Sequence, residues 1–245
     1  MSALPILCYH NVAAVPGDAP FKLLYVGPEM FERQLWSLRR LGMRGVSTGE
    51  GIARLRNATS RGCVVFTFDD GYADTLTTAA PILKQYGFGA TCYVVSSALG
   101  THNRWDAEYL RERKPLMTRE QLDQWLAAGM EVGSHSLSHQ RLPELPEETA
   151  RCEIAESRAV LRSMLGVPIE HFAYPFGSFT PDVVELVRRA GYSSAVTVVP
   201  GVARASGDPL QLPRILVDGE RGLWKFLLHA ATPYGRLRRR APGTA

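Results

Sequence analysis

The sequence predicts an α/β fold, and two observations indicate that its parallel sheet closes into a barrel. Short apolar segments rich in β-branched and aromatic residues alternate with helical segments, which is the pattern of a parallel sheet covered by helices. Reactive side chains follow the ends of four different predicted strands, as is typical of a barrel. The 245 residues contain no linker-like segment, so we expect one substantial core.

Eight segments are predicted to be strands because each is a short apolar run bounded by turn residues. The run at residues 63–68 is apolar almost throughout, as expected for a strand that is buried on both faces. The predicted strands are residues 5–9, 45–47, 63–68, 90–95, 131–133, 171–174, 193–198 and 212–217.

The helices between these strands are recognised by their ends. Pro28 in a first turn and Gly42 after a last turn bracket one helix. Thr118 and Gln121 have the spacing of a capping box and open a second helix, which Gly129 ends. Two further helices are predicted over residues 147–165 and between Thr180 and Gly191.

The positive charge of the chain is concentrated at its C-terminus. The formal net charge is +4, but residues 220–245 hold six basic residues and one acidic residue, so the rest of the chain carries −1. The body of the chain therefore lacks the basic face of a nucleic-acid-binding protein. We divide the chain into a main domain at residues 1–222 and a C-terminal helix with a basic tail at residues 223–245.

Two interpretations of this C-terminal segment stay open. Its apolar and basic residues are suited to peripheral contact with an anionic membrane surface. Alternatively, the helix packs on the barrel and the basic end is solvated. The residues concerned are Trp224, Phe226, Leu227, Leu228, Arg236, Arg238, Arg239 and Arg240.

The cysteines and the absence of apolar targeting segments favour a cytoplasmic protein. No Cys-x-x-Cys spacing occurs, and Cys8, Cys63 and Cys92 lie in predicted strands, so we expect buried free thiols. The sequence shows neither a signal-peptide pattern nor an apolar run that would span a bilayer. The expectation is a cytoplasmic location, at the inner face of the membrane if the tail contacts lipid.

Two polar motifs supply the residues of a candidate metal centre. Asp70, His135 and His139 provide three ligands, a shell that leaves room for water. The neighbouring Asp69 can then act as the general base, and metal-assisted hydrolysis needs this combination. Taken singly, each motif has an ordinary explanation as a turn or a solvated loop. The motifs are Thr-Phe-Asp-Asp-Gly at residues 67–71 and His-Ser-Leu-Ser-His at residues 135–139.

The ligand types favour Zn²⁺ as the metal, although Co²⁺, Ni²⁺ and Fe²⁺ suit the same donors. A two-carboxylate glycosidase is a poor alternative, because adjacent Asp69 and Asp70 cannot flank a sugar ring from opposite faces. Residues 100–115 show little periodicity and are predicted to form a loop over the site, with Trp105 contacting the substrate.

A third motif, Phe-Ala-Tyr-Pro-Phe-Gly at residues 172–177, completes a resemblance to a known family. From about residue 10 to about residue 217 the chain resembles the polysaccharide deacetylases, the carbohydrate esterases with a NodB homology domain. The resemblance implies a distorted, TIM-like (β/α)7 barrel that removes N-acetyl groups from sugars. It also implies that Asp69 is the base, that Asp70, His135 and His139 hold the metal, and that the Phe176 N–H helps form an oxyanion hole. Tyr174 and Pro175 of the same motif are expected beside the substrate.

Two departures from the family pattern lead to further predictions. Ala173 stands where many relatives carry an arginine that pairs with the base, and we predict that Arg214 replaces it; a surface ion pair is the alternative. Leu-Leu-His at residues 227–229 matches the usual Leu-x-His motif but lies in a predicted helix, so we assign the general acid to His10 instead. His10 ends the first strand, an arrangement that resembles the permuted biofilm-polysaccharide deacetylases. A satisfied core histidine is the alternative.

The resemblance implies an N-acetylated glycan as the substrate, and the lack of a signal-peptide pattern favours a glycan intermediate on the cytoplasmic side, such as a lipid-linked sugar. An O-acetyl esterase or an N-deformylase with the same site, and a non-catalytic glycan-binding module, are the alternatives that the residues leave open.

Overall fold

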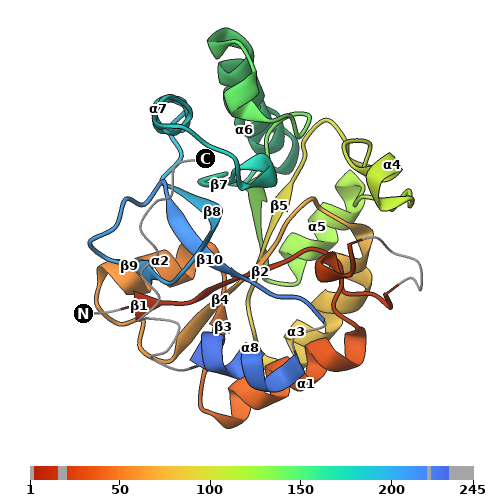
Figure 1. The fold of residues 1–245 in the computed structure, drawn as a ribbon, viewed down its shortest axis with the longest axis vertical. Helices are drawn as coiled ribbons and strands as arrows, with labels where there is room; N and C mark the ends of the chain where they lie inside the picture. The colour runs from red at the N-terminus through yellow and green to blue at the C-terminus, as the bar shows by residue number, and fades with distance from the viewer. Residues whose placement is uncertain (1–2, 16–20, 220–221, 232–245) are drawn as a thin grey trace.

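The computed structural model describes residues 3–15, 21–219 and 222–231. At its centre, seven parallel strands form a ring (Figure 1), in the order β2, β10, β8, β7, β6, β5 and β4, and a β2–β4 pairing closes it. This confirms the predicted (β/α)7 barrel. The strands are β2 (Ile6–Tyr9), β4 (Cys63–Phe68), β5 (Thr91–Val94), β6 (Glu131–Ser134), β7 (His171–Ala173), β8 (Ser194–Pro200) and β10 (Leu212–Leu216).

The eighth predicted strand, β3 (Arg44–Val46), lies outside the ring. It pairs with residues 63–65 of β4, whereas β5 pairs with residues 67–68, so β3 and β5 share one edge of β4. The structure also contains a short antiparallel pair, β1 (Ala3–Leu4) and β9 (Ala203–Arg204). Two-residue strands are too short for a periodic pattern, so this pair was not predicted.

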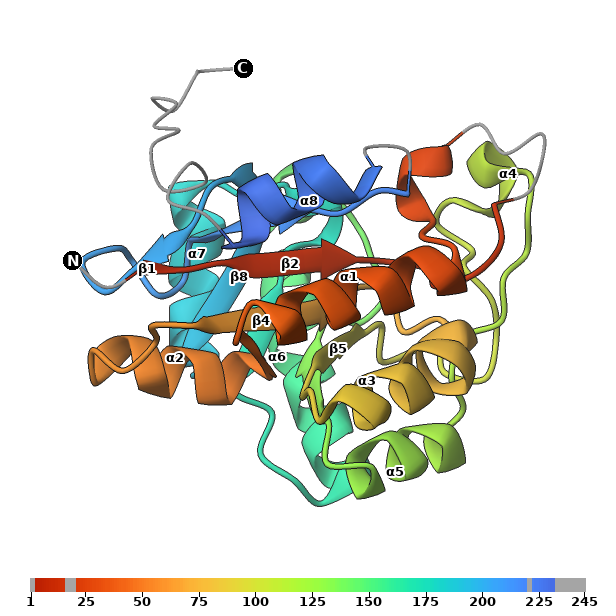
Figure 2. The same ribbon diagram turned by 90° about the horizontal axis from the view of Figure 1, so that it is seen from below.

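Helices cover the outside of the ring, and α1, α3 and α5 run along one flank of it (Figure 2). The predicted capping box is present, because the Gln121 N–H donates to Thr118 Oγ1 and the Thr118 N–H donates to Gln121 Oε1. The helices are α1 (Pro28–Arg40), α2 (Thr48–Arg56), α3 (Ala80–Tyr86), α4 (Ala107–Leu110), α5 (Arg119–Ala127), α6 (Glu147–Leu165), α7 (Pro181–Arg189) and α8 (Gly222–Ala231), with short turns of 3-10 or π-helix at Lys22–Leu24, Thr75–Ala79, Leu142–Glu144 and Pro175–Gly177.

The alternation of side chains along β4 separates two cores. Cys63 and Val65 belong to the cluster inside the barrel, whereas Phe66 and Phe68 pack between the strands and the helices. The same alternation continues past the end of the strand, so Asp69 lies on the inner side of the ring. The register of β4 therefore decides which carboxylate enters the barrel.

Helix α8 packs against α1, with Phe226 and Ala230 buried in the shared core. Phe226 is therefore not available for the predicted membrane contact, whereas Trp224 is 75% exposed. The arginines predicted to contact lipid, residues 236 and 238–240, lie outside the described residues. Within the described part of the chain, no helix is both long and apolar enough to cross a membrane. Cys8, Cys63 and Cys92 are buried free thiols, as predicted.

Candidate active site

The carboxyl ends of four strands bring the predicted reactive residues to one pocket of about 350 Å³. Asp69 and Asp70 follow β4, His135 follows β6, and His10 follows β2. Residues from the loops after β5, β6 and β7 complete the pocket wall, among them Trp105, His139, Tyr174 and Phe176. Pro175 is buried in the turn before Phe176, and Arg214 lies beneath Asp69 in the barrel.

Asp70, His135 and His139 converge on one point. Asp70 Oδ1 lies 3.5 Å from His135 Nε2 and 3.3 Å from His139 Nε2, and the two imidazole nitrogens are 3.2 Å apart. A tetrahedral ion with ligands at about 2.0–2.1 Å has edges of about 3.3–3.4 Å between ligand atoms. The three donors therefore already have the spacing that a small divalent cation requires, and both their number and their chemistry fit it.

Neighbouring groups orient these three side chains. His135 Nδ1 lies 2.8 Å from the Ala173 carbonyl oxygen, so it carries the proton and leaves Nε2 free as a ligand. Trp105 stacks on the His139 ring and Phe176 meets that ring edge-on, each with its ring centroid 4.5 Å from the centroid of His139. Burial raises the pKa of Asp70, but hydrogen bonds with His135 and His139 outweigh it and hold the pKa well below its ordinary value.

The backbone of the site is strained. Of the non-glycine residues with left-handed φ in the described chain, four lie here: Asp70 (72°), Ser136 (67°), His139 (63°) and Phe176 (56°). Such conformations are costly for residues with a Cβ atom, and they persist only where the surrounding structure enforces them. Their concentration at the pocket indicates a site whose geometry is fixed by its surroundings.

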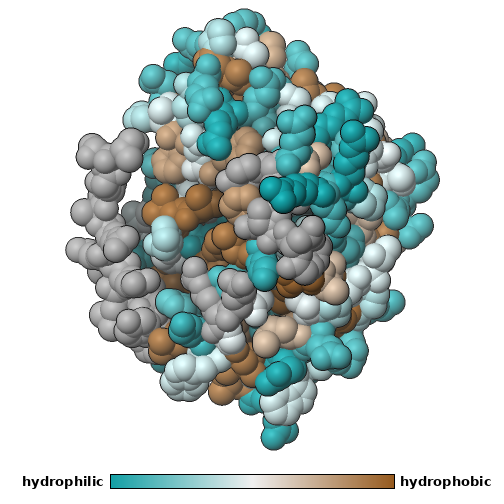
Figure 3. Space-filling model, turned by 45° about the vertical axis from the view of Figure 1, so that its right-hand side comes forward, coloured by the Kyte–Doolittle hydropathy of each residue, from teal (hydrophilic) through white to brown (hydrophobic). Residues whose placement is uncertain are grey.

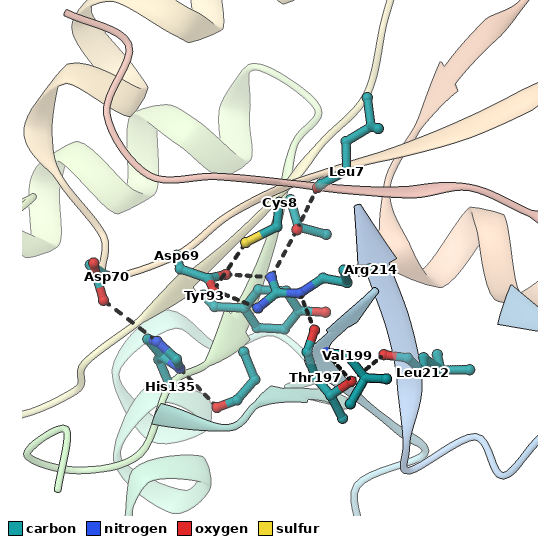
Figure 4. Close-up of polar contacts among 12 residues, drawn as sticks. Leu7, Cys8, Asp69, Asp70, Tyr93, His135, Thr197, Val199, Leu212 and Arg214 are labelled. Carbon is teal, nitrogen blue, oxygen red and sulfur yellow. Dashed lines mark hydrogen bonds and ion pairs between the residues drawn. The ribbon is translucent and has the colours of Figure 1, made fainter. Parts of the chain in front are cut away.

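Asp69 is held by Arg214 in a buried, two-point ion pair (Figure 4). Arg214 Nη1 donates to Asp69 Oδ1 over 2.7 Å, and Nη2 donates to Oδ2 over 2.6 Å. Because Arg214 is 1% exposed, the alternative of a surface ion pair is wrong. Burial raises the pKa of Asp69, but the charge and hydrogen bonds of Arg214 outweigh it, so the pKa lies below its ordinary value.

The guanidinium of Arg214 is fixed on its other sides. Nε donates to the Thr197 carbonyl oxygen over 2.8 Å, and Nη1 also donates to Thr67 Oγ1 over 3.0 Å. The pairing of β10 with β8 is irregular between Leu212 and Arg214, and such a bulge re-aims a side chain. Arg214 therefore enters the barrel from a strand that is remote in sequence from Ala173.

His10 lies beside the base at the edge of the pocket. One of its ring nitrogens, Cys8 Sγ and a carboxylate oxygen of Asp69 lie within 4.8 Å of one another. His10 Nδ1 is buried and has no hydrogen-bond partner among the described residues. Cys8 Sγ donates weakly to Asp69 Oδ2 over 3.5 Å, and burial raises the pKa of its thiol well above the ordinary value. Cys8 is thus a neutral thiol rather than a nucleophile.

The pocket contains residues that sequence reasoning missed. Asp106 lines it, accepts a hydrogen bond from Asn103 Nδ2 over 2.7 Å, and has a pKa raised to about 7 by burial and by Asp70. Its position next to Trp105 in the predicted loop was the available signal. Leu23 and Val198 add exposed apolar surface at the pocket. Hydrophobic residues gather near the middle of the face shown in Figure 3.

Similarity to known proteins identifies the family to which this site belongs. A model of the family described as polysaccharide deacetylase matches residues 56–195, more than half of the chain. The chain belongs to the polysaccharide deacetylase family. It is therefore a hydrolase of the polysaccharide deacetylase type. It is 28% identical over 217 residues to YxkH of Bacillus subtilis, whose name assigns it to the same family, covering 88% of this chain and 71% of that protein.

Other known proteins match over most of this chain. The poly-beta-1,6-N-acetyl-D-glucosamine N-deacetylase of Escherichia coli is 25% identical over 257 residues, which cover 90% of this chain and 37% of that protein. The Streptococcus pyogenes deacetylase PplD, solved in complex with acetate, superposes with a TM-score of 0.80 and 26% identity, covering 95% of this chain and 99% of that one. IcaB from Ammonifex degensii gives 0.76 and 25%, covering 96% and 97%.

Proposed function

We propose that this polysaccharide deacetylase is a metal-dependent hydrolase that removes N-acetyl groups from an acetamido sugar of a glycan. The observation that carries the proposal is the convergence of two groups in one pocket: the ligand set Asp70, His135 and His139, and the pair of Asp69 with His10. The first set suits a cation and the second suits proton transfer. Neither group alone would specify amide hydrolysis.

Asp70, His135 and His139 would hold the cation, with Zn²⁺ as the first choice and Co²⁺, Ni²⁺ or Fe²⁺ as alternatives. When bound, such a cation supplies a Lewis acid for the amide carbonyl and makes a water molecule more acidic. The three side chains are buried, so their donor atoms are shielded from competing bulk water.

Different residues carry out the two proton transfers of the reaction. Asp69 accepts a proton from the attacking water as the water oxygen forms a bond to the carbonyl carbon. The Phe176 N–H donates to the carbonyl oxygen as negative charge develops there. Protonated His10 donates to the amide nitrogen as the carbon–nitrogen bond breaks, which releases acetate and the free amine. Arg214 keeps Asp69 ionised and in place, because both carboxylate oxygens accept from it.

The substrate proposal rests on the relatives and on the shape of the pocket. Several relatives are named for N-deacetylation of poly-beta-1,6-N-acetyl-D-glucosamine. The apolar wall of Leu23, Phe176 and Val198 suits the apolar face of a sugar ring or the lipid of a lipid-linked sugar. We propose a glycan of N-acetylglucosamine type, with a lipid-linked intermediate at the cytoplasmic face of the membrane as the second candidate.

The test is acetate release from N-acetylglucosamine oligomers and from a lipid-linked acetamido sugar, with and without a chelator. Chelator-sensitive release that returns on adding Zn²⁺ or Co²⁺ is the expected result. Equal release from an O-acetylated or N-formylated sugar would move the assignment to an esterase or a deformylase. Protein that contains metal and binds the oligomers, but hydrolyses none of these substrates, would be a glycan-binding module.

A further inference from the structure

The segment between the two predicted metal-binding histidines is an irregular loop with unusual backbone geometry. His135 follows β6, and within the next four residues both Ser136 and His139 adopt left-handed φ. The Ser136 hydroxyl accepts from the His139 N–H over 2.9 Å, which stabilises the turn only locally. A loop with two such residues needs further contacts from outside to keep one conformation.

Glu153, in helix α6, makes these contacts with the loop. Its Oε2 accepts from the Ser138 N–H over 2.8 Å, and its Oε1 accepts from Ser138 Oγ over 2.5 Å and from Gln140 Nε2 over 3.1 Å. The Glu153 carbonyl oxygen also accepts from the Leu137 N–H over 3.0 Å. The side chain is 4% exposed, which is rare for a glutamate unless it is fully bonded.

We infer that Glu153 is a positioning residue for the metal centre: its carboxylate fixes the 136–140 loop and thereby sets His139 at ligand distance from His135 and Asp70. The carboxylate accepts from both the backbone N–H and the hydroxyl of Ser138, directly before His139, so a change of the loop that moves His139 would break these bonds. The inference rests on the proposed metal site. The inference adds to that site a residue that is itself neither a metal ligand nor a lining residue of the pocket.

The test is the affinity of the purified chain for Zn²⁺, measured by competition with a chromophoric chelator, in Glu153→Gln. The substitution keeps the size of the side chain, but an NH2 group replaces one of the two accepting oxygens. This NH2 group then faces N–H or O–H donors and cannot accept from them. Loss of partners behind metal ligands typically weakens metal affinity by roughly 10–100-fold, and we expect a loss in that range. The visible absorption of bound Co²⁺ should change as well, because it reports the geometry of the ligands. Glu156→Gln, an exposed carboxylate one turn further along α6, is the matched control.

A double-substitution cycle with Ser138→Ala separates positioning from general destabilisation. The losses in Zn²⁺ affinity should be less than additive, because both changes remove the same contact. Affinity of Glu153→Gln within twofold of the parent would overturn the inference and leave the metal site intact. Additive losses that parallel a lower melting temperature of the metal-free protein would also overturn it. A parent chain that takes up no divalent cation would instead overturn the proposed metal site, and this inference with it.

Discussion

Both ends of the barrel contain paired histidine and carboxylate side chains, but among the described residues only the carboxyl end of the strands leaves such a histidine with an unpartnered buried atom. At the carboxyl end of the strands, Asp70, His135 and His139 crowd three ligand atoms together. At the opposite end, Glu131 of β6 and His171 of β7 form an ion pair with 3.3 Å between Oε1 and Nε2. Composition alone does not distinguish the two clusters.

The partners of each cluster distinguish them. Glu131 Oε2 accepts from Thr91 Oγ1 over 2.6 Å and from the Gly49 N–H over 3.0 Å, and His171 Nδ1 lies 2.8 Å from Ser194 Oγ. A Cβ atom at Gly49 would lie 2.6 Å from Glu131 Oε1, so this end is closely packed. In contrast, unpartnered buried atoms at the pocket include His10 Nδ1, Trp105 Nε1 and His139 Nδ1. The hydrogen bonds of Glu131 and His171 indicate a structural role, whereas the unpartnered atoms at the pocket are available to a ligand.

The largest expected effect at the pocket comes from Asp69→Asn. Asparagine is nearly the same size as aspartate but cannot accept a proton, so kcat should fall by about 10²–10⁴-fold. Bound Zn²⁺, measured by elemental analysis, should stay at the parent level because Asp69 is not among the three ligands. Full activity in this variant would remove Asp69 from the role of base.

Arg214→Met tests the electrostatic support of the base. Removing the positive charge raises the pKa of Asp69, so the acidic limb of the kcat/KM profile should move to higher pH. The variant should also be less stable by about 3–5 kcal/mol, because Asp69 is left buried and unpaired. An unchanged acidic limb in folded protein would show that this limb reports another group. Arg188→Met, in an exposed ion pair, is the matched control.

At the other end of the barrel, Glu131→Gln should change stability and not catalysis. We expect a loss of about 1–3 kcal/mol in the free energy of unfolding at pH 7, because hydrogen bonds to a partly buried charged group are lost. Burial raises the pKa of Glu131, but bonds with His171, Thr91 and Gly49 outweigh it, so the pKa is lowered. The stabilisation is thus complete above the unfolded-state pKa and disappears as the pH falls through the folded-state pKa.

Denaturant titrations of parent and Glu131→Gln between pH 3 and pH 8 measure this difference. The two curves should converge at the acidic end. A fall in kcat per folded molecule would contradict the structural role assigned to this cluster.

The smallest effect is expected from Trp105→Phe. The smaller ring can still stack on His139, but the indole N–H is lost, and that donor has no partner among the described residues. If the substrate accepts its hydrogen bond, KM should rise by about 2–10-fold with little change in kcat. An unchanged KM would mean that this unpaired atom does not contact the substrate.

The sequence predicted the parts of the site that are close together in the chain. Asp69 and Asp70 are neighbours, and His135 and His139 lie four residues apart, so motif spacing was sufficient. Arg214 was predicted only through the missing arginine at position 173. The bulge in β10 that aims it into the barrel depends on pairing with β8 and leaves no local signal.

Other features depended on tertiary contacts. The helices α2, α3 and α4 were not predicted; α2 is short and contains two glycines, α3 follows a π-helical turn, and α4 is one turn of helix within the segment 100–115 that was predicted to be a loop. The division of one edge of β4 between β3 and β5 follows from strand register, which the pattern of apolar residues does not specify. Glu153 looked like one polar residue of an amphipathic helix, because its partners are largely backbone and loop groups.

The position of β2 in the ring affects when the barrel can close during folding. This strand precedes every other strand of the ring in the sequence, yet it pairs with β10 through Leu7 and Ile215, near the other end of the described chain. Asp69 likewise cannot form its ion pair until Arg214, 145 residues further along the chain, has been added. Strands β2 and β4 can pair early on the ribosome, but the ring closes only after β10 has emerged. Until then a strand edge stays open, and Asp69 lacks the guanidinium that pairs with it in the folded barrel.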